Sequence, residues 1–295
     1  MENPSPLRYP GGKNKTYDYV KQLVLKNNCT TYIEPFAGGA AVALNLLLNG
    51  IVKKIIINDF DRSIYALWHS IIYHPSQLIN LINDTDITME EWYTQKEIQK
   101  NKETVPLLTL GFSTLFLNRT NRSGIIKGGV IGGIKQESKY SMDCRFPKDK
   151  LIQKITIISN LSDNIDLYNM DAILFIDEVI KKTRKSFTFF DPPYYNKGPS
   201  LYTNFYKHQN HVDLANKIKK DLRNRKWIVT YDHASEIKEM YKKLANIKYY
   251  LSYTAQDKKK GIEYMFYSNV TETASPGIYL NMFTNEIHNL KLKAT

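Results

Sequence analysis

The stretch TTYIEPFAGGAAVALNLLLNG, residues 30–50, changes its hydrophobic period in the middle. TTYIE is typical of a strand, PFAGG of a turn, and AAVALNLLLNG of a helix that Asn49 and Gly50 end. The next run, VKKIIINDFD (52–61), is β-branched and ends in acids, which is typical of a second parallel strand. Together these segments predict a βαβ unit, the opening of a doubly wound α/β sheet. Its glycine turn lies where backbone can approach a ligand closely.

An acidic residue follows the predicted second strand. Asp59 lies 21 residues after Gly38, and in dinucleotide-binding folds an acid at such a spacing accepts hydrogen bonds from ribose hydroxyls. The spacing therefore predicts a ligand that contains adenosine. Because the turn lacks the full G-x-G-x-x-G pattern for a pyrophosphate, S-adenosylmethionine fits better than a dinucleotide. The alternative is that Gly38 and Gly39 only allow tight packing of strand against helix.

A second strand end with candidate functional residues lies in SFTFFDPPYYNKGPS, residues 186–200. SFTFF is apolar enough to be buried on both faces of the sheet, and ligands of open α/β sheets bind beyond the carboxyl ends of the strands. Asp191 and the carbonyl of Pro192 can accept hydrogen bonds from one amino group, Pro193 stiffens the turn, and the ring of Tyr194 can stack on a base. This pattern predicts a grip on a planar group that carries an amine. A plain proline turn is the alternative.

The composition narrows the class of protein. Lys and Arg number 41 against 29 acids, for a net charge of +12, which is the balance of a protein that meets polyanions. Two cysteines exclude a disulfide scaffold, and we expect no metal, since HQNH (208–211) lacks a third ligand. The sequence shows neither a signal peptide nor an apolar run long enough for a membrane span. We therefore expect a soluble cytoplasmic protein without a membrane partner.

The segment 66–165 is too long for a crossover connection and has helical periodicity. We interpret it as an inserted, mostly helical domain, with residues 1–65 and 166–295 forming the discontinuous catalytic domain. Within the insert, residues 118–140 are rich in glycine and carry Arg119, Arg122, Lys127 and Lys135. This composition predicts a basic β-hairpin that enters a DNA groove. A mobile surface loop is the alternative.

These motifs, in this order, resemble the Dam-type (D12 class, alpha-group) DNA adenine methyltransferases over nearly the whole chain. The matching segments are LRYPGGK (7–13), IEPFAGGAAV (33–42), INDFDRSIYALW (57–68), FSTLFLNRTNRSG (112–124), DPPY (191–194), WIVTYDHASEIKEMY (227–241) and IEYMFYSN (262–269). The resemblance implies a Rossmann-like methyltransferase sheet with an inserted target-recognition domain. It also implies direct methyl transfer from S-adenosylmethionine to the exocyclic amine of an adenine flipped out of double-stranded DNA, by a monomer.

The resemblance also assigns roles to residues. The residues implied to hold the flipped adenine are Asp191, Pro192, Pro193 and Tyr194. Those implied to contact S-adenosylmethionine are Tyr9, Lys13, Phe36, Ala37, Gly38, Gly39, Asp59 and Asp191. Those implied to contact DNA are Asn118, Arg119, Arg122, Ser123, Lys127 and Lys135.

The chain departs from the family pattern in the hairpin. Members that methylate GATC usually have an aromatic residue and an asparagine before the glycine, where this chain has Arg122 and Ser123, and they lack GGVIGGIKQ (128–136). The recognition sequence therefore stays open. Two other readings also remain: methylation of RNA or of a protein side-chain amide, and a DNA-binding relative without activity. For the tail, residues 271–295, packing on the core and contact with a partner are both open.

Overall fold

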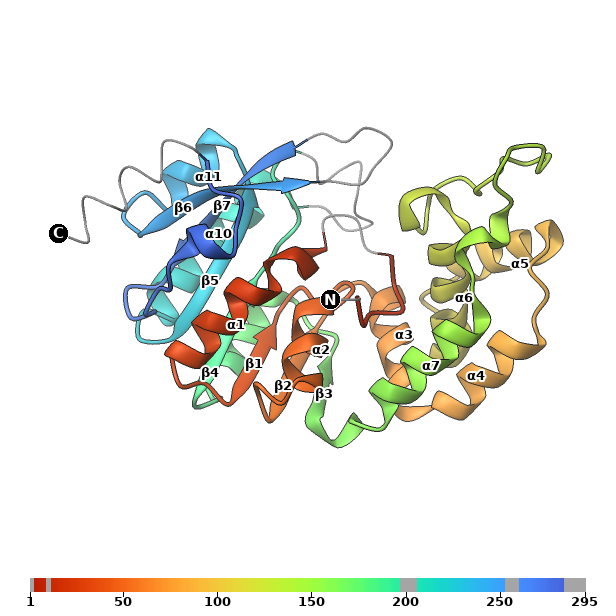
Figure 1. The fold of residues 1–295 in the computed structure, drawn as a ribbon, viewed down its shortest axis with the longest axis horizontal. Coiled ribbons are helices and arrows are strands. Elements are labelled where there is room, and N and C mark those ends of the chain that lie inside the picture. Colours follow the sequence, from red (N-terminus) through yellow and green to blue (C-terminus); the bar gives the residue numbers. More distant parts are fainter. Residues whose placement is uncertain (1–2, 9–11, 197–205, 253–259, 284–295) are drawn as a thin grey trace.

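A seven-stranded sheet forms the centre of the molecule in the computed structural model, which describes residues 3–8, 12–196, 206–252 and 260–283. The strand order is β3-β2-β1-β4-β5-β7-β6, with the first five strands parallel and β7 antiparallel to both of its neighbours (Figure 1). This arrangement confirms the predicted doubly wound α/β sheet. The strands are β1 (Thr31–Glu34), β2 (Lys54–Asn58), β3 (Ile165–Tyr168), β4 (Ser186–Phe190), β5 (Lys226–Asp232), β6 (Asn246–Ser252) and β7 (Lys260–Tyr267).

The unit from β1 to β2 forms as its periodicity predicts. Gly38 has a φ of +45° in the turn and Gly50 a φ of +65° after α2 (Ala41–Leu48), a backbone region that glycine enters without strain. In the sheet, β1 pairs with β2 on one side and with β4 on the other. The order of strands therefore reverses between β1 and β4, and in such sheets the ligand binds beyond the carboxyl ends of the strands at that point.

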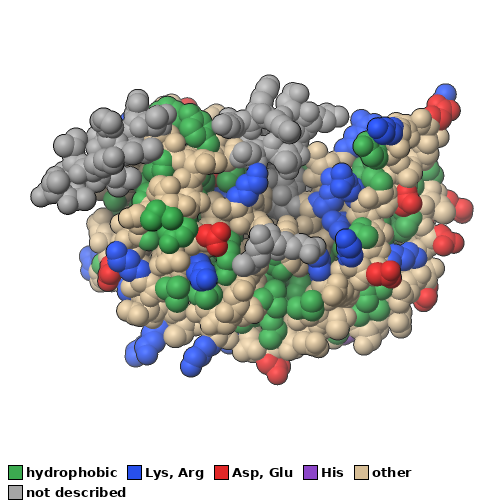
Figure 2. Space-filling view, viewed as in Figure 1, with side chains coloured by type: hydrophobic (Ala, Val, Ile, Leu, Met, Phe, Trp, Pro, Cys, Tyr) green, Lys and Arg blue, Asp and Glu red, His purple; other side chains and the backbone are tan. Residues whose placement is uncertain are grey.

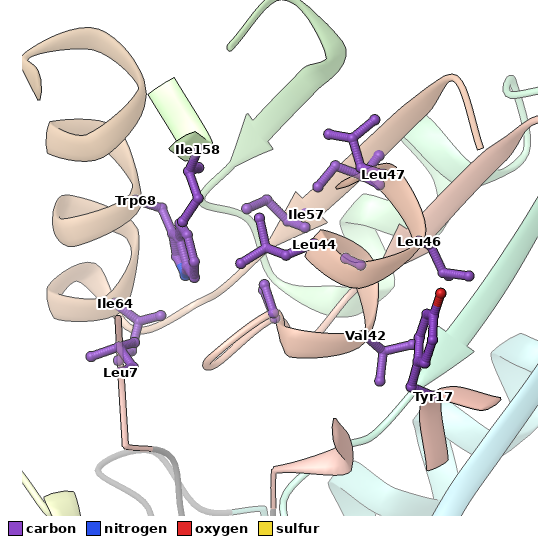
Figure 3. Close-up of a cluster of buried hydrophobic side chains, with 14 of the residues drawn as sticks. Leu7, Tyr17, Val42, Leu44, Leu46, Leu47, Ile57, Ile64, Trp68 and Ile158 are labelled. Atoms are coloured by element: carbon purple, nitrogen blue, oxygen red, sulfur yellow. The ribbon is translucent and has the colours of Figure 1, made fainter. Parts of the chain in front are cut away.

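Helices cover both faces of the sheet. One face packs on α1 (Tyr17–Lys26) and α2, which follow the short 3-10 turn η1 (Lys13–Thr16), and Figure 3 shows Tyr17, Val42 and Leu46 in this core. The other face packs on the second group of helices. These are α8 (Ala172–Phe175), the π turn η5 (Ile176–Ile180), α10 (His208–Asp221) and α11 (Ser235–Met240).

A group of helices between β2 and β3 stands beside the sheet (Figure 1). The helical periodicity at the start of this region is divided at Pro75 into two helices, because proline is tolerated in the first turn of a helix but not in its interior. Residue 66, the predicted start of the insert, lies inside α3, whose main packing partner is α6. The helices are α3 (Arg62–Tyr73), α4 (Pro75–Asp84), α5 (Met89–Lys100), α6 (Leu107–Thr120) and α7 (Lys148–Ser159).

The predicted hairpin takes a different form. Within residues 118–140, all of which the structure describes, the β pairing is a single antiparallel bridge between Asn121 and Val130 rather than two strands. The 3-10 turn η2 (Arg122–Gly124) follows α6 directly, and further positive-φ glycines at 132 and 133 keep the chain turning. Frequent left-handed residues prevent the extended runs that a ladder needs. A second 3-10 turn, η3 (Met142–Arg145), then leads into α7.

The tail packs on the core as far as the structure describes it. The N–H of Tyr250 donates to the carbonyl of Asn281 at 2.7 Å, so the chain after the 3-10 turn η6 (Pro276–Ile278) lies along the edge strand β6. Asn27 at the end of α1 accepts from the N–H of Glu272 at 3.0 Å. Core packing thus accounts for residues 271–283. In the part of the chain that the structure describes, no helix is long and apolar enough to cross a membrane.

Candidate active site

The carboxyl end of β4 presents Asp191. All five residues of β4 are buried, so the strand is packed on both faces. Asp191 directly follows the last residue of this central strand. One carboxylate oxygen, Oδ1, accepts from the hydroxyl of Thr230 on β5 at 2.7 Å. The ammonium of Lys13 lies 2.8 Å from the same oxygen. Two predicted site residues, 178 positions apart in the sequence, are therefore in direct contact.

Lys13 and Tyr194 meet in the same cluster. The side chain of Lys13 is only 5% exposed, and its ammonium donates to the Tyr194 hydroxyl at 2.8 Å. Burial opposes the charged form of Lys13, but the carboxylates of Asp191 and Glu263 outweigh that cost and raise its pKa. Lys13 therefore stays an ammonium, and a buried ammonium is stable only with such partners.

Glu263 on β7 completes the cluster, although the sequence did not point to it. It is fully buried and accepts hydrogen bonds from the hydroxyls of Tyr194 and Tyr249, the latter at 2.6 Å. Burial is the main reason that the pKa of Asp191 is raised, and the nearby Glu263 adds to the rise while Lys13 opposes it. The site thus holds two carboxyl groups around one ammonium.

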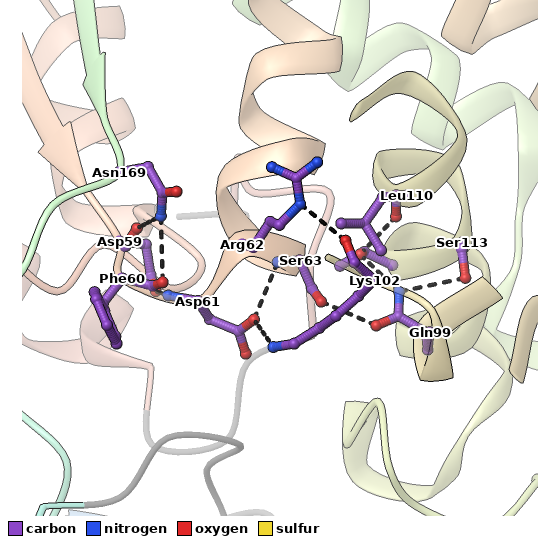
Figure 4. A network of polar contacts seen from close by, with 11 residues as sticks. Asp59, Phe60, Asp61, Arg62, Ser63, Gln99, Lys102, Leu110, Ser113 and Asn169 are labelled. Atoms are coloured by element: carbon purple, nitrogen blue, oxygen red, sulfur yellow. Dashed lines mark hydrogen bonds and ion pairs between the residues drawn. The ribbon is translucent and has the colours of Figure 1, made fainter. Parts of the chain in front are cut away.

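A second part of the site lies at the ends of β1 and β2. The N–H of Gly38 donates to Oδ2 of Asp59 at 2.9 Å, and Trp68 on α3 donates to the carbonyl of Gly38 at 2.9 Å. Ala37 is buried in the same turn, which Gly39 continues. Figure 4 shows Asn169 bound to the carbonyls of Asp59 and Phe60. The predicted glycine turn and the predicted acid are therefore joined directly.

The Asp59 side chain is half-buried, and each of its carboxylate oxygens accepts one backbone N–H. Burial chiefly, with Asp61 nearby, raises its pKa to about 7, although the N–H groups of Gly38 and Asp61 oppose the rise. A ligand that offers hydroxyl donors, as a ribose does, would supply what the carboxylate lacks. Phe60 beside it is 60% exposed and offers an apolar face for a ring. This acceptor and this ring fit a ligand that contains a ribose and a base.

Two aromatic rings, those of Phe36 and Tyr206, lie 5.9 Å apart with an edge-to-face geometry. Burial chiefly, and then the charges of Asp171 and Asp59, raise the pKa of Tyr206. His211 is buried and shares a hydrogen bond with the Tyr231 hydroxyl at 2.9 Å, which accounts for the HQNH segment as structural. Among the described residues, no group of three or more His, Cys, Asp or Glu side chains is placed to hold a metal ion.

The turn after the DPPY segment is held by one further acid. Asp232 at the end of β5 accepts from the N–H of Tyr195 at 2.9 Å and from the N–H of Asn196 at 3.0 Å. Pro192 is buried and Pro193 half-buried, so the segment is fixed from both ends. Tyr9 lies outside the described residues.

The residues predicted to contact DNA differ in their exposure: some are buried or half-buried and others are exposed. Asn118 is buried, and its amide bonds the backbone of Arg8 in both directions and the carbonyl of Gly124, so it joins segments rather than facing a ligand. Ser123 is half-buried with a φ of +56°. The exposed residues of the group are Arg122, Lys127 and Lys135.

Arg119 belongs to an arginine cluster that the sequence did not reveal. Burial chiefly, and then the charges of Arg8 and Arg145, lower the pKa of Arg119 to about 10. Its buried Nε has no hydrogen-bond partner within the described part of the chain. Three like charges drawn together around an unused donor favour an anion as ligand. Figure 2 shows Lys and Arg side chains gathered along the side of the helical region that faces the sheet.

Sequence reasoning missed these groups for a common reason. Glu263, Thr230, Arg8 and Arg145 become neighbours of the site only through long-range strand order and helix packing. Phe60 was the exception, since a large aromatic residue directly after the ribose acid is a signal in the sequence itself.

Comparison of the sequence with known proteins shows the family of the chain. The family model for D12 class N6 adenine-specific DNA methyltransferases matches residues 9–255. The chain is 25% identical over 211 residues, 66% of its length and 70% of the relative's, to the Type II methyltransferase M.MjaIII of Methanocaldococcus jannaschii. It is 24% identical over 260 residues, 84% of its length and 90% of the relative's, to the Type II methyltransferase M.CviBI of Paramecium bursaria Chlorella virus NC1A.

The strand order, the clustered DPPY segment and the family match over most of the chain agree. The sheet is a Rossmann-like methyltransferase fold, and the substrate is DNA rather than RNA or a protein amide. The chain belongs to the D12 class N6 adenine-specific DNA methyltransferases, enzymes that methylate adenine in DNA.

Proposed function

We propose that the chain uses S-adenosylmethionine to methylate the exocyclic amine of one adenine within a short duplex motif, at the site formed by Asp191, Tyr194 and Lys13. The observation that carries this proposal is the contact of Lys13 with both Asp191 and Tyr194 at the carboxyl end of β4. One chain supplies every group of this site, so we propose that it acts as a monomer.

The donor would lie at the carboxyl ends of β1 and β2. Asp59 would accept hydrogen bonds from the ribose hydroxyls, Phe60 and Phe36 would contact the rings, and the turn from Ala37 to Gly39 would allow close approach. S-adenosylmethionine supplies a methyl group on a positively charged sulfur. The acidic groups around Lys13 favour a cation at that place, which supports this donor.

The chain's own groups would prepare the acceptor. Asp191 and the carbonyl of Pro192 would accept the two hydrogens of the adenine amine, which concentrates the nitrogen lone pair on the side of the methyl group. The nitrogen–carbon bond would form as the carbon–sulfur bond breaks, which leaves the neutral thioether S-adenosylhomocysteine, and the positively charged amine would then lose a proton to water. Fixed alignment supplies most of the acceleration, because well-oriented partners reach effective molarities of about 10⁵–10⁸ M.

The helical region 66–165 would bind the duplex around the flipped adenine. Arg119, with Arg8 and Arg145 beside it, would neutralise backbone phosphate, and such contacts position the protein without reading sequence. Arg122, Lys127 and Lys135 are exposed along the segment 118–140 and would lie closest to the bases. Asn118 would act by shaping this segment, since its side chain is buried, and Ser123 would act through its left-handed backbone in the turn.

Calorimetric binding of S-adenosylmethionine tests the donor site. Asp59→Ala is expected to weaken binding about tenfold or more, because the ribose hydroxyls lose a charged acceptor. Asp166→Ala is the matched control, since Asp166 makes a half-exposed ion pair with Lys54 at 2.8 Å on the neighbouring strand β3. We expect that control to bind within about twofold of wild type. Equal binding by all three proteins would contradict the proposed donor site.

A further inference from the structure

Glu263 is a buried carboxyl group to which no role has been given. It lies on β7, in register with Asp232 of β5 and Tyr249 of β6, and is 0% exposed. Its Oε1 accepts from the Tyr194 hydroxyl and its Oε2 accepts from the Tyr249 hydroxyl at 2.6 Å. A buried carboxyl group is costly to the fold, so its retention beside the DPPY segment points to a function.

Lys13 lies between the carboxyl groups of Asp191 and Glu263. Lys13 lies 2.8 Å from Oδ1 and 2.9 Å from Oδ2 of Asp191, but 3.7 Å from Oε1 of Glu263. The Tyr194 hydroxyl accepts from Lys13 and donates to Glu263, so it bridges the ammonium and the second carboxylate. Among the described residues, the ammonium of Lys13 therefore contacts both carboxyl groups, directly at Asp191 and through the Tyr194 hydroxyl at Glu263, in a region of low dielectric.

We infer that Glu263 is a positioning residue for methyl transfer, which fixes the hydroxyl of Tyr194 and shares the charge of Lys13 so that Asp191 remains a strong acceptor for the adenine amine. This inference rests on the proposed roles of Asp191 and Tyr194. Without Glu263, the ammonium of Lys13 would neutralise Asp191 alone. With it, negative charge remains at the place where the amine becomes positive, which is preorganised electrostatic stabilisation.

The same groups set how Asp191 titrates. Lys13 and Thr230 lower its pKa, and Glu263 raises it in addition to burial. On neighbouring elements, the charge of Asp191 adds to the rise, due mainly to burial, in the pKa of Glu34 and Tyr32 on β1 and of Tyr231 on β5. Replacing Glu263 with a neutral amide removes one raising effect, so the pKa of Asp191 falls. The acidic limb of the kcat profile should move with it to lower pH.

The test is the variant Glu263→Gln with steady-state kinetics across pH. We expect kcat to fall about tenfold while KM for DNA changes less than about threefold, because the lost interaction acts in the transition state. The acidic limb should move to lower pH. Dissociation constants for DNA and S-adenosylmethionine, measured separately by calorimetry, should stay within about threefold of wild type.

A second variant keeps the charge and removes only a donor. Tyr249→Phe deletes the hydroxyl that orients Glu263, and we expect kcat to fall about threefold with the pH limb in place. Tyr19→Phe is its matched control, because Tyr19 is equally buried and its hydroxyl pairs with Tyr267 at 2.9 Å, away from the cluster. The control should keep kcat within about twofold.

The outcomes separate this inference from the proposed site. If Asp191→Ala abolishes methylation while Glu263→Gln keeps both the kcat and the pH limb of wild type, the role of Glu263 is wrong and the site stands. If Asp191→Ala remains active, the proposed site itself is wrong. If Tyr249→Phe and Tyr19→Phe lose kcat equally, the loss comes from the fold and the inference fails.

Discussion

At the scale of single residues, Glu34 shows how burial links ionisation to stability. It lies at the end of β1 and accepts from the N–H of Ala43 at 3.2 Å, yet burial raises its pKa to about 8. In the unfolded chain a glutamate has a pKa of about 4.3. Between these values the folded state binds the proton more tightly, so stability is greatest below the unfolded pKa and falls as the pH rises toward 8.

The first prediction follows from this decrease in stability as the pH rises. Thermal unfolding of the ligand-free protein should give a lower Tm at pH 8 than at pH 5, and Glu34→Gln should reduce this difference because its amide does not titrate. Asp166→Asn, at a half-exposed position on β3, is the control and should leave the difference unchanged. A pH dependence that is the same in Glu34→Gln and wild type would show that Glu34 is ionised in the fold.

A second residue, Arg122, concerns sequence choice. Its side chain is exposed just after α6, and its backbone N–H donates to the carbonyl of Gly129 at 2.9 Å, which fixes the turn that carries it. Arg122→Ala should relax the choice of DNA sequence more than it lowers turnover at the cognate site, since a contact from arginine to guanine is worth about 1–3 kcal/mol of discrimination. Methylation mapped on random duplexes measures this. An equal loss on every sequence would mean that Arg122 contacts only phosphate.

At the scale of elements, the junction of the N-terminal segment with α6 depends on Gly124. Its φ is +76°, and a Cβ built there would lie 2.1 Å from the carbonyl oxygen of Arg8. Asn118 bonds both segments at this point. The junction thus sets where Arg8 stands relative to Arg119.

Gly124→Ala should therefore destabilise the protein by about 2 kcal/mol or more, because the left-handed backbone and the close approach both exclude a side chain. Gly129→Ala is the matched control: it lies in the same segment with nothing within 4 Å of the added Cβ. We expect the control to stay within about 0.5 kcal/mol in urea unfolding. Similar losses in the two variants would contradict the tight junction.

The elements also show what the sequence could and could not predict. The unit from β1 to β2 and the buried strand β4 were predictable because local periodicity and turn residues decide them. The polar network in Figure 4, where Asp61 before α3 pairs with Lys102 after α5 at 3.1 Å, depends on how both helices pack on α6, which no local pattern encodes. The hairpin prediction failed for a local reason, since left-handed residues replace the ladder by one bridge.

Within the site, only residues that belong to a recognisable sequence motif could be predicted from the sequence. Lys13, Asp59 and Asp191 were predictable because each follows a recognisable turn or strand end. Glu263 comes to the same cluster because β7 runs antiparallel between β5 and β6, and strand order across the sheet is a long-range property. Arg8, Arg119 and Arg145 lie on three separate segments, so their cluster exists only in the folded chain.

At the scale of the whole molecule, the net charge is +12, and basic residues lie in more than one part of the fold. Arg145 belongs to the cluster beside Arg119. Arg223 lies between α10 and β5, before the amino end of β5, whereas the site lies at the carboxyl ends of the strands. Arg145→Ala should lower the slope of log Kd against log salt concentration for duplex DNA by about one, because one phosphate contact is lost. Arg223→Ala should leave the slope unchanged. Equal slopes in the two variants would place the DNA elsewhere.

The central claim is that Asp191, held by Lys13 at the carboxyl end of β4, positions an adenine of duplex DNA for methylation. The most direct measurement is the transfer of labelled methyl groups from S-adenosylmethionine to unmethylated genomic DNA, with sequencing that maps each modified adenine. We predict incorporation at the adenine of one short motif by the wild-type protein and none by Asp191→Ala, with cofactor binding retained in Glu263→Gln. Methylation that persists in Asp191→Ala, or cofactor binding by the wild type without incorporation into any DNA, would contradict the account.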